Sequence, residues 1–116
     1  MSRKQLFVIF IISVMLPMRV VAIGVKLENW EEFKKDYKSI SEVHIGGVGY
    51  GYSWANTALG GRGDTPFYCV PEKLVLNNRH YIEIIDREIL RTEEPYSPDY
   101  PIELILLLGL INTFPC

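Results

Sequence analysis

The chain has 116 residues, of which 12 are basic, 14 are acidic and 48% are hydrophobic, and its net charge is −2. This length is enough for one small domain. The slightly acidic balance argues against nucleic acid or an anionic membrane surface as the partner.

The first 22 residues have the pattern of a secretory signal. Basic residues at the start precede an apolar stretch over residues 6–16, and small residues lead to Ala22. Arg19 interrupts the apolar stretch before it reaches the roughly 20 residues that a membrane span needs. We therefore predict a signal peptide over residues 1–22, cleavage after Ala22, and a single exported domain over residues 23–116 without a membrane anchor.

Cleavage would remove three basic residues and no acid, leaving nine basic and 14 acidic residues and a net charge of −5. The only two cysteines, Cys69 and Cys116, are expected to form a disulfide in an exported protein. Cys116 would otherwise lie on a fraying tail. By the chain-entropy model, the bond would stabilise the domain by about 4 kcal/mol.

The first predicted helix covers residues 29–40. Asn29 suits the N-cap, two glutamates follow in the first turn, and Trp30, Phe33, Tyr37 and Ile40 recur at helical spacing.

Residues 43–59 carry a second helical pattern that is weakened by glycine. Small and apolar residues form a stripe, while each of the four glycines costs up to about 1 kcal/mol in a helix. The stripe consists of Val43, Gly47, Gly51, Trp54 and Ala58. We predict either a separate second helix or a continuation of the first with a kink near residues 46–47. The glycine spacing does not match a nucleotide-binding loop.

Two loops and two further helices complete the predicted domain. Three glycines and a proline indicate a loop over residues 60–66, in which Arg62 and Asp64 are interpreted as turn residues rather than as an adhesion motif. Asn77 or Asn78 is expected to cap a third helix whose apolar face is Tyr81, Ile82, Ile85 and Ile89.

Residues 92–101 contain three prolines and should form a stiff surface loop. Between Pro101 and Pro115, residues 102–114 are apolar on nearly every face, which predicts a central helix or one that buries a side in a homodimer. The predicted fold is thus all-α, a small bundle of four helices (three to five) stapled by one disulfide.

We predict no catalytic residue, metal or cofactor. A cysteine nucleophile would need Cys69 as a thiolate beside His44 or His80, and disulfide pairing would remove it. The spacing of the two cysteines and two histidines fits no compact zinc site.

Several of these features occur in one order along the chain. They are the export signal, a Gly- and Tyr-rich helix, the segment Phe67-Tyr68-Cys69-Val70-Pro71, a proline-bearing loop, and an apolar helix that ends Phe114-Pro115-Cys116. In this order they resemble the Rap/Tai family of type VI secretion immunity proteins. Glu94-Pro95-Tyr96 and the leucine-rich last helix depart from that family's usual sequence.

The resemblance implies a small all-helical periplasmic protein, often a homodimer, that binds and blocks an injected toxin. In the best-described branch that toxin is a peptidoglycan amidase, and a loop of the immunity protein plugs its active site. When the plugging loop of that family is placed on this sequence by position, the 92–101 loop is the first choice and the 60–66 loop is the second. The expected contact residues are Glu94, Tyr96, Asp99, Tyr100, Arg62 and Asp64.

Two other classes of function remain open from the sequence. One is a small periplasmic helical chaperone or stress protein, and the other is an inhibitor of a different cell-wall hydrolase. For Tyr96 and Tyr100, a purely structural role as a cover over the end of the bundle also remains open.

Overall fold

The structure is a computed structural model that describes residues 24–116. The predicted signal peptide and its cleavage site lie outside these residues. A short 3-10 helix, η1 (Leu27–Asn29), leads into α2 (Trp30–Asp36), α3 (Lys38–Gly61), α4 (Asn78–Arg91) and α5 (Ile102–Thr113). This all-α architecture with one disulfide confirms the predicted fold class.

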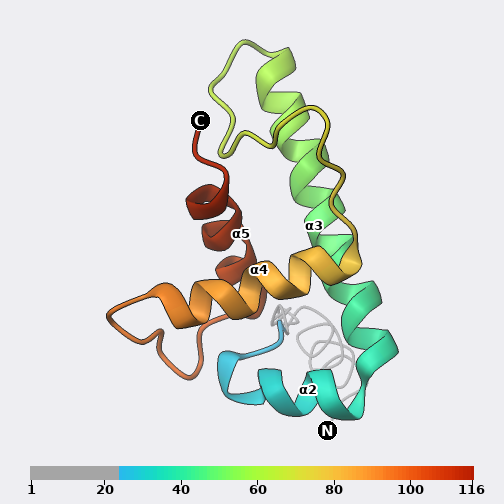
Figure 1. Cartoon of the computed structure of the whole chain (residues 1–116), viewed down its shortest axis with the longest axis vertical. Helices are drawn as coiled ribbons and strands as arrows, with labels where there is room; N and C mark the ends of the chain where they lie inside the picture. The colour runs from blue at the N-terminus through green and yellow to red at the C-terminus, as the bar shows by residue number, and fades with distance from the viewer. Residues whose placement is uncertain (1–23) are drawn as a thin grey trace, which may run out of the picture.

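The chain turns between α2 and α3 at Tyr37, where φ is −130° and ψ is 51°. α2 consequently lies across the base of the molecule while α3 rises from its end (Figure 1). The turn lets the buried Trp30 donate from Nε1 to Asp86 Oδ1 on α4, at 2.8 Å. The helix predicted over residues 29–40 is instead interrupted at Tyr37, and residues 38–61 form a separate second helix that continues through the four glycines of residues 43–59.

The core lies where α4 packs between α3 and α5 (Figure 1). Its buried apolar side chains are Trp30, Ile45, Tyr68, Tyr81, Ile84, Ile85, Ile102, Ile105, Leu106 and Leu110. Glycine permits the close approach of these helices. A Cβ on Gly49 of α3 would lie 2.6 Å from the Tyr81 ring, and one on Gly109 of α5 would lie 2.8 Å from Ile84 Cγ2.

The caps confirm part of the sequence pattern. Asn77 caps α4 through its side chain, which accepts from His80 N at 3.0 Å, while His80 Nδ1 accepts from Asn77 N at 3.1 Å. Asn29 does precede α2, but its side chain makes no capping hydrogen bond. Here η1 occupies the turn before α2, and Asn29 N donates to Lys26 O instead.

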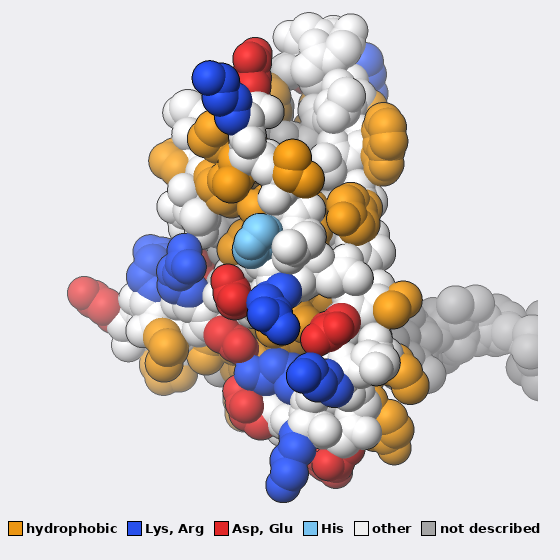
Figure 2. Space-filling model, turned by 45° about the vertical axis from the view of Figure 1, so that its right-hand side comes forward, with side chains coloured by type: hydrophobic (Ala, Val, Ile, Leu, Met, Phe, Trp, Pro, Cys, Tyr) orange, Lys and Arg blue, Asp and Glu red, His pale blue; other side chains and the backbone are white. Residues whose placement is uncertain are grey.

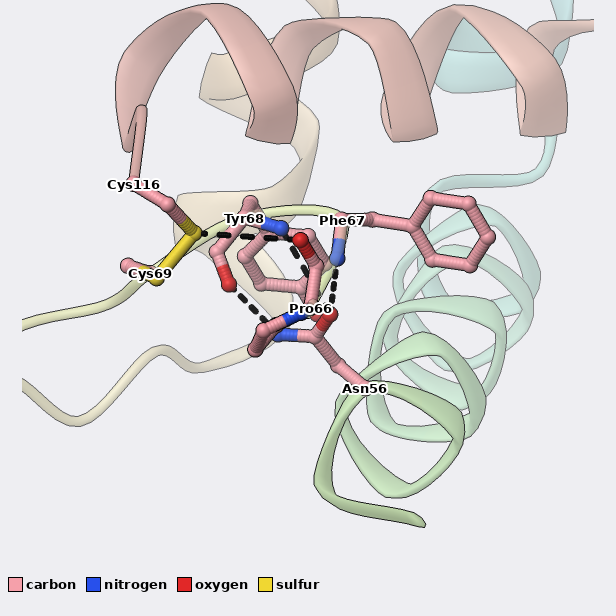
Figure 3. The surroundings of a disulfide bond; sticks show 6 residues. All are labelled: Asn56, Pro66, Phe67, Tyr68, Cys69 and Cys116. Carbon is pink, nitrogen blue, oxygen red and sulfur yellow. Dashed lines mark hydrogen bonds between the residues drawn. A yellow bond between two sulfur atoms is a disulfide. The ribbon is translucent and has the colours of Figure 1, made fainter. Parts of the chain in front are cut away.

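The C-terminal tail is fixed to the segment that follows α3 (Figure 3). Cys69 and Cys116 form the predicted disulfide, with their Cα atoms 4.9 Å apart. Cys69 N also donates to Phe114 O at 2.8 Å. From α3, Asn56 accepts from Phe67 N at 2.7 Å and donates to Tyr68 O at 2.6 Å. We call this arrangement the tail junction.

Candidate functional site

The loop over residues 92–101 joins α4 to α5 and exposes a tip that carries three carboxylates and no basic residue. Glu93, Glu94 and Asp99 are exposed, whereas Tyr96 and Tyr100 are half-buried. We refer to residues 92–101 as the acidic loop. It projects from the side of the molecule where α4 ends (Figure 1).

Glu88 anchors the acidic loop from α4. Its side chain is only 3% exposed. Oε1 accepts from Tyr96 Oη at 2.9 Å, from Arg91 Nη2 at 2.9 Å and from Asn112 Nδ2 at 3.0 Å. Burial acts to raise the pKa of Glu88, but the hydrogen bonds from these three residues outweigh it and lower the pKa below its ordinary value. The carboxylate therefore remains charged and holds the loop to two helices.

The two tyrosines of the acidic loop pack inward. The rings of Tyr96 and Tyr100 lie 5.0 Å apart, and both contact the hydrophobic core. Burial, together with the hydrogen bond to Glu88, raises the pKa of Tyr96 to about 12. These contacts match the structural role of covering the bundle, so alanine at either position would remove packing as well as any contact with a partner.

Residues 24–28, which lead into η1 and form its first turn, hold the acidic loop from its other side. Leu27 N donates to Tyr100 O and Glu28 N donates to Pro98 O, both at 2.9 Å. Ile102 N donates to Val25 O at 2.8 Å. We call residues 24–28, the acidic loop, Glu88 and Glu103 together the loop junction. Because its backbone is bonded at several points, the loop has little freedom left to lose when it docks.

At the tip, Asp99 is fixed within the loop itself. The Ser97 hydroxyl donates to Asp99 Oδ1. This hydrogen bond and one from the backbone lower the pKa of Asp99, which keeps the exposed carboxylate charged.

Arg62 and Asp64 belong to the 60–66 loop, which follows the C-terminal end of α3 and lies away from the acidic loop (Figure 1). Both are exposed, and Arg62 Nε lies 3.5 Å from Asp64 Oδ2. Between them, Gly63 has φ +78°, a conformation that favours glycine and matches the turn predicted there. The structure therefore does not bring the two predicted contact loops together on one surface.

The stripe predicted along residues 43–59 lies on the exposed side of α3, and sequence reasoning did not identify it as a surface. Val43 is 70% exposed and Trp54 is 75% exposed, and a Cβ on Gly47 or Gly51 would meet nothing within 4 Å. We call this stripe, extended by Ile40 and Tyr50, the outer face of α3. Hydrophobic side chains gather over the upper part of the molecule in Figure 2, whereas charged ones gather below.

A hollow of about 310 Å³ adjoins the outer face of α3. It lies between α3 and the segment that leads to α4, and Tyr50, Tyr68, Leu74 and Tyr81 are among the residues that line it. Tyr68 is 3% exposed, and its hydroxyl has no hydrogen-bond partner within residues 24–116. Burial raises the pKa of Tyr68 to about 12, so the hydroxyl stays protonated.

The residues considered for catalysis have structural partners. Cys69 is in the disulfide, His44 Nε2 lies 2.8 Å from Glu103 Oε1, and His80 caps α4. Within residues 24–116, no three His, Cys, Asp or Glu side chains are grouped closely enough to hold a metal ion. In the same part of the chain, no helix has both the length and the hydropathy to cross a membrane.

Comparisons of the sequence and structure with protein-family models, with curated proteins and with solved structures found no match.

Proposed function

We propose that this protein is an exported, periplasmic immunity protein that neutralises a toxin, and that the toxin is a peptidoglycan amidase. The single observation that supports this best is the acidic loop, a rigid projection anchored on both sides with carboxylates at its tip. A preorganised loop of this kind suits insertion into the cleft of an enzyme. The disulfide is compatible with an oxidising compartment.

The charge of the acidic loop defines the kind of surface it would contact. Glu93, Glu94 and Asp99 are exposed acidic residues, so the complementary cleft should be lined with basic groups or backbone N–H donors. Charge complementarity of this type mainly increases the association rate and the specificity.

Sequencing the reading frames beside this gene, followed by a binding assay with any peptidoglycan amidase found there, tests the proposal. We expect one-to-one inhibition of peptidoglycan hydrolysis by the mature domain. Replacing both Glu94 and Asp99 with Lys should weaken binding at least about tenfold, which corresponds to about 1.4 kcal/mol. The matched control reverses two exposed carboxylates elsewhere, Glu32→Lys with Glu72→Lys. Equal affinity of both double variants would exclude the acidic loop, and failure of the unaltered domain to inhibit would overturn the proposal.

For the outer face of α3 we propose a second copy of this chain as the partner. The open glycines would allow two helices to approach closely, and the flanking Ile40, Val43 and Trp54 would be buried between them. Trp54→Glu should convert a dimer into a monomer in light-scattering measurements. Ala55→Glu, on the next residue around the helix, should leave the dimer intact. If the unaltered protein is a monomer at every concentration that can be measured, this assignment is contradicted.

The exposed apolar residues also favour one alternative function, a periplasmic helical chaperone. Such a protein would suppress the aggregation of unrelated clients through the outer face of α3, and it would not bind one enzyme with fixed stoichiometry. Trp54→Glu would then reduce client protection while Glu94→Lys with Asp99→Lys would not. Inhibition of a wall hydrolase other than an amidase would instead change only the target class.

A further inference from the structure

The hollow beside the outer face of α3 combines aromatic walls with a single carboxylate. Three of its lining residues are tyrosines, five are apolar, and Glu72 is the only charged one. Its volume of about 310 Å³ is at the lower end of the range of about 300–1,000 Å³ that small-molecule sites occupy. The size therefore suits a small ligand.

Two of the tyrosine rings form a corner of the hollow. The rings of Tyr50 and Tyr81 meet edge to face, with centroids 5.8 Å apart and planes inclined by 77°. Tyr50 is 47% exposed and is the ring that a ligand can reach, while Tyr81 is buried behind it. Burial raises the pKa of Tyr81, so the ring is a neutral phenol. The faces of such rings attract a cation within about 6 Å of the ring centre.

The wall that carries Tyr68 is held in place by the tail junction. Asn56 Nδ2 donates to Tyr68 O at 2.6 Å, and the next residue, Cys69, is in the disulfide (Figure 3). Val70, on the other side of Cys69, also lines the hollow. A wall fixed in this way has little conformational freedom to lose when a ligand binds.

The charge at the hollow is negative. Glu72 is exposed, and none of the salt bridges within residues 24–116 includes it. Lys73 follows it in the sequence but does not line the hollow. Charge complementarity therefore favours a cation as the ligand.

The lining also indicates which kind of cation fits. A primary ammonium has three N–H donors, and each needs an acceptor once water is removed. Besides the tyrosines, Ser53 and Glu72 are the only polar residues in the lining. A quaternary ammonium has no N–H donor, and its positively charged methyl groups can contact aromatic and aliphatic side chains directly.

We propose that the hollow binds a small quaternary ammonium compound, with its methyl groups against the Tyr50–Tyr81 corner and its charge near Glu72. This site goes beyond the proposed immunity function. It shares no residue with the acidic loop.

Titration of the 15N-labelled protein with choline tests the inference. We expect saturable shifts of amide signals in residues 50–53 and 70–76, together with nuclear Overhauser contacts between the choline methyl protons and the Tyr50 ring. The uncharged analogue of choline, with carbon in place of nitrogen, has the same shape. At constant ionic strength it should bind at least about threefold more weakly, because it lacks the attraction of a cation to the rings and to Glu72.

Two exposed lining residues provide variants that leave the core intact. Tyr50→Leu removes the aromatic ring and Glu72→Gln removes the charge, and each should weaken choline binding at least about threefold. The matched controls are Phe67→Leu and Lys73→Gln. They change an exposed aromatic residue and an exposed charge that do not line the hollow, so they should retain the original affinity.

Equal affinity for choline and its uncharged analogue would overturn the inference. Unchanged choline affinity in both Tyr50→Leu and Glu72→Gln would do the same, as would the absence of saturable binding. Binding to phosphatidylcholine vesicles without binding to free choline would also overturn it, because the ligand would then be a lipid surface. None of these outcomes bears on amidase binding, which is measured separately.

Discussion

The tail junction and the loop junction hold the two ends of the described chain by different physical means. At the tail junction a covalent bond joins Cys69 to Cys116, and Asn56 holds the adjoining backbone. At the loop junction the attachments are hydrogen bonds, several of them to the carboxylates of Glu88 and Glu103. The first should respond to reduction and the second to pH. The two junctions can therefore be disrupted independently.

Removing the disulfide should have the largest effect on stability. The bond closes a sequence separation of 47 residues, and the chain-entropy model assigns such a loop about 4 kcal/mol. The double variant Cys69→Ser with Cys116→Ser should lose about this much free energy of unfolding in urea titrations. The unaltered protein should show the same loss after reduction. A much smaller loss in both would mean that the non-covalent contacts of the tail junction suffice.

Glu88→Gln should have the next largest effect, about 2 kcal/mol, because a charged acceptor with three donors is replaced by a neutral group. The acidic loop should loosen at the same time, which amide hydrogen exchange at residues 96–100 would detect. Glu83→Gln, an exposed carboxylate on the same helix, is the control and should change stability little. A wild-type exchange pattern in Glu88→Gln would show that the loop does not depend on this anchor.

Acid should weaken the loop junction while leaving the disulfide intact. The pKa of Glu88 is lowered in the folded protein, so its stabilising contribution is present above the unfolded pKa and is lost as pH falls through the folded value. Between about pH 5 and pH 3, the free energy of unfolding should fall more for the unaltered protein than for Glu88→Gln. Parallel pH profiles would contradict this role of Glu88.

A matched pair of glycine substitutions measures the helix packing that connects the junctions. Gly49→Ala should destabilise the protein by about 1–3 kcal/mol, because the new methyl group would meet the Tyr81 ring. Gly47→Ala, on the outer face of α3, should stabilise it by up to about 1 kcal/mol through higher helix propensity. Thermal melts would measure both, and the same sign for both would contradict the assigned orientation of α3.

The sequence predicted those features that depend on local patterns. Asn77 as the cap of α4, the apolar α5 and the pairing of Cys69 with Cys116 are confirmed. In each case neighbouring residues, or the presence of only two cysteines, carry the signal. The turn residues Arg62 and Asp64 likewise lie in a short local loop.

The orientation of α3 and the two anchoring glutamates could not be predicted in the same way. The four closely spaced glycines of residues 46–51 and several apolar residues allow more than one stripe on α3, and contact with Tyr81 shows that Gly49 faces inward. Glu103 bonds to Val25, 78 positions earlier in the chain, so no local pattern identifies it. Glu88 did leave a signal, since it falls at helical spacing on the apolar face with Tyr81 and Ile85.

Among the candidate contact residues, too, some features follow from local sequence and others from tertiary contacts. The composition of residues 92–101, which is polar and rich in proline, predicts a surface loop, and the exposure of Glu94 and Asp99 follows from it. The inward packing of Tyr96 and Tyr100 depends on Glu88 and the core, so the sequence left their role open.

An intact-mass measurement of the protein recovered from the periplasm tests most directly the claim that this is an exported, stapled domain. The account predicts a chain that begins at Ile23 and is two hydrogens lighter than its reduced form, which corresponds to one disulfide. Reduction should restore the two hydrogens. A chain that retains residues 1–22, or one in which both cysteines remain thiols, would contradict the account.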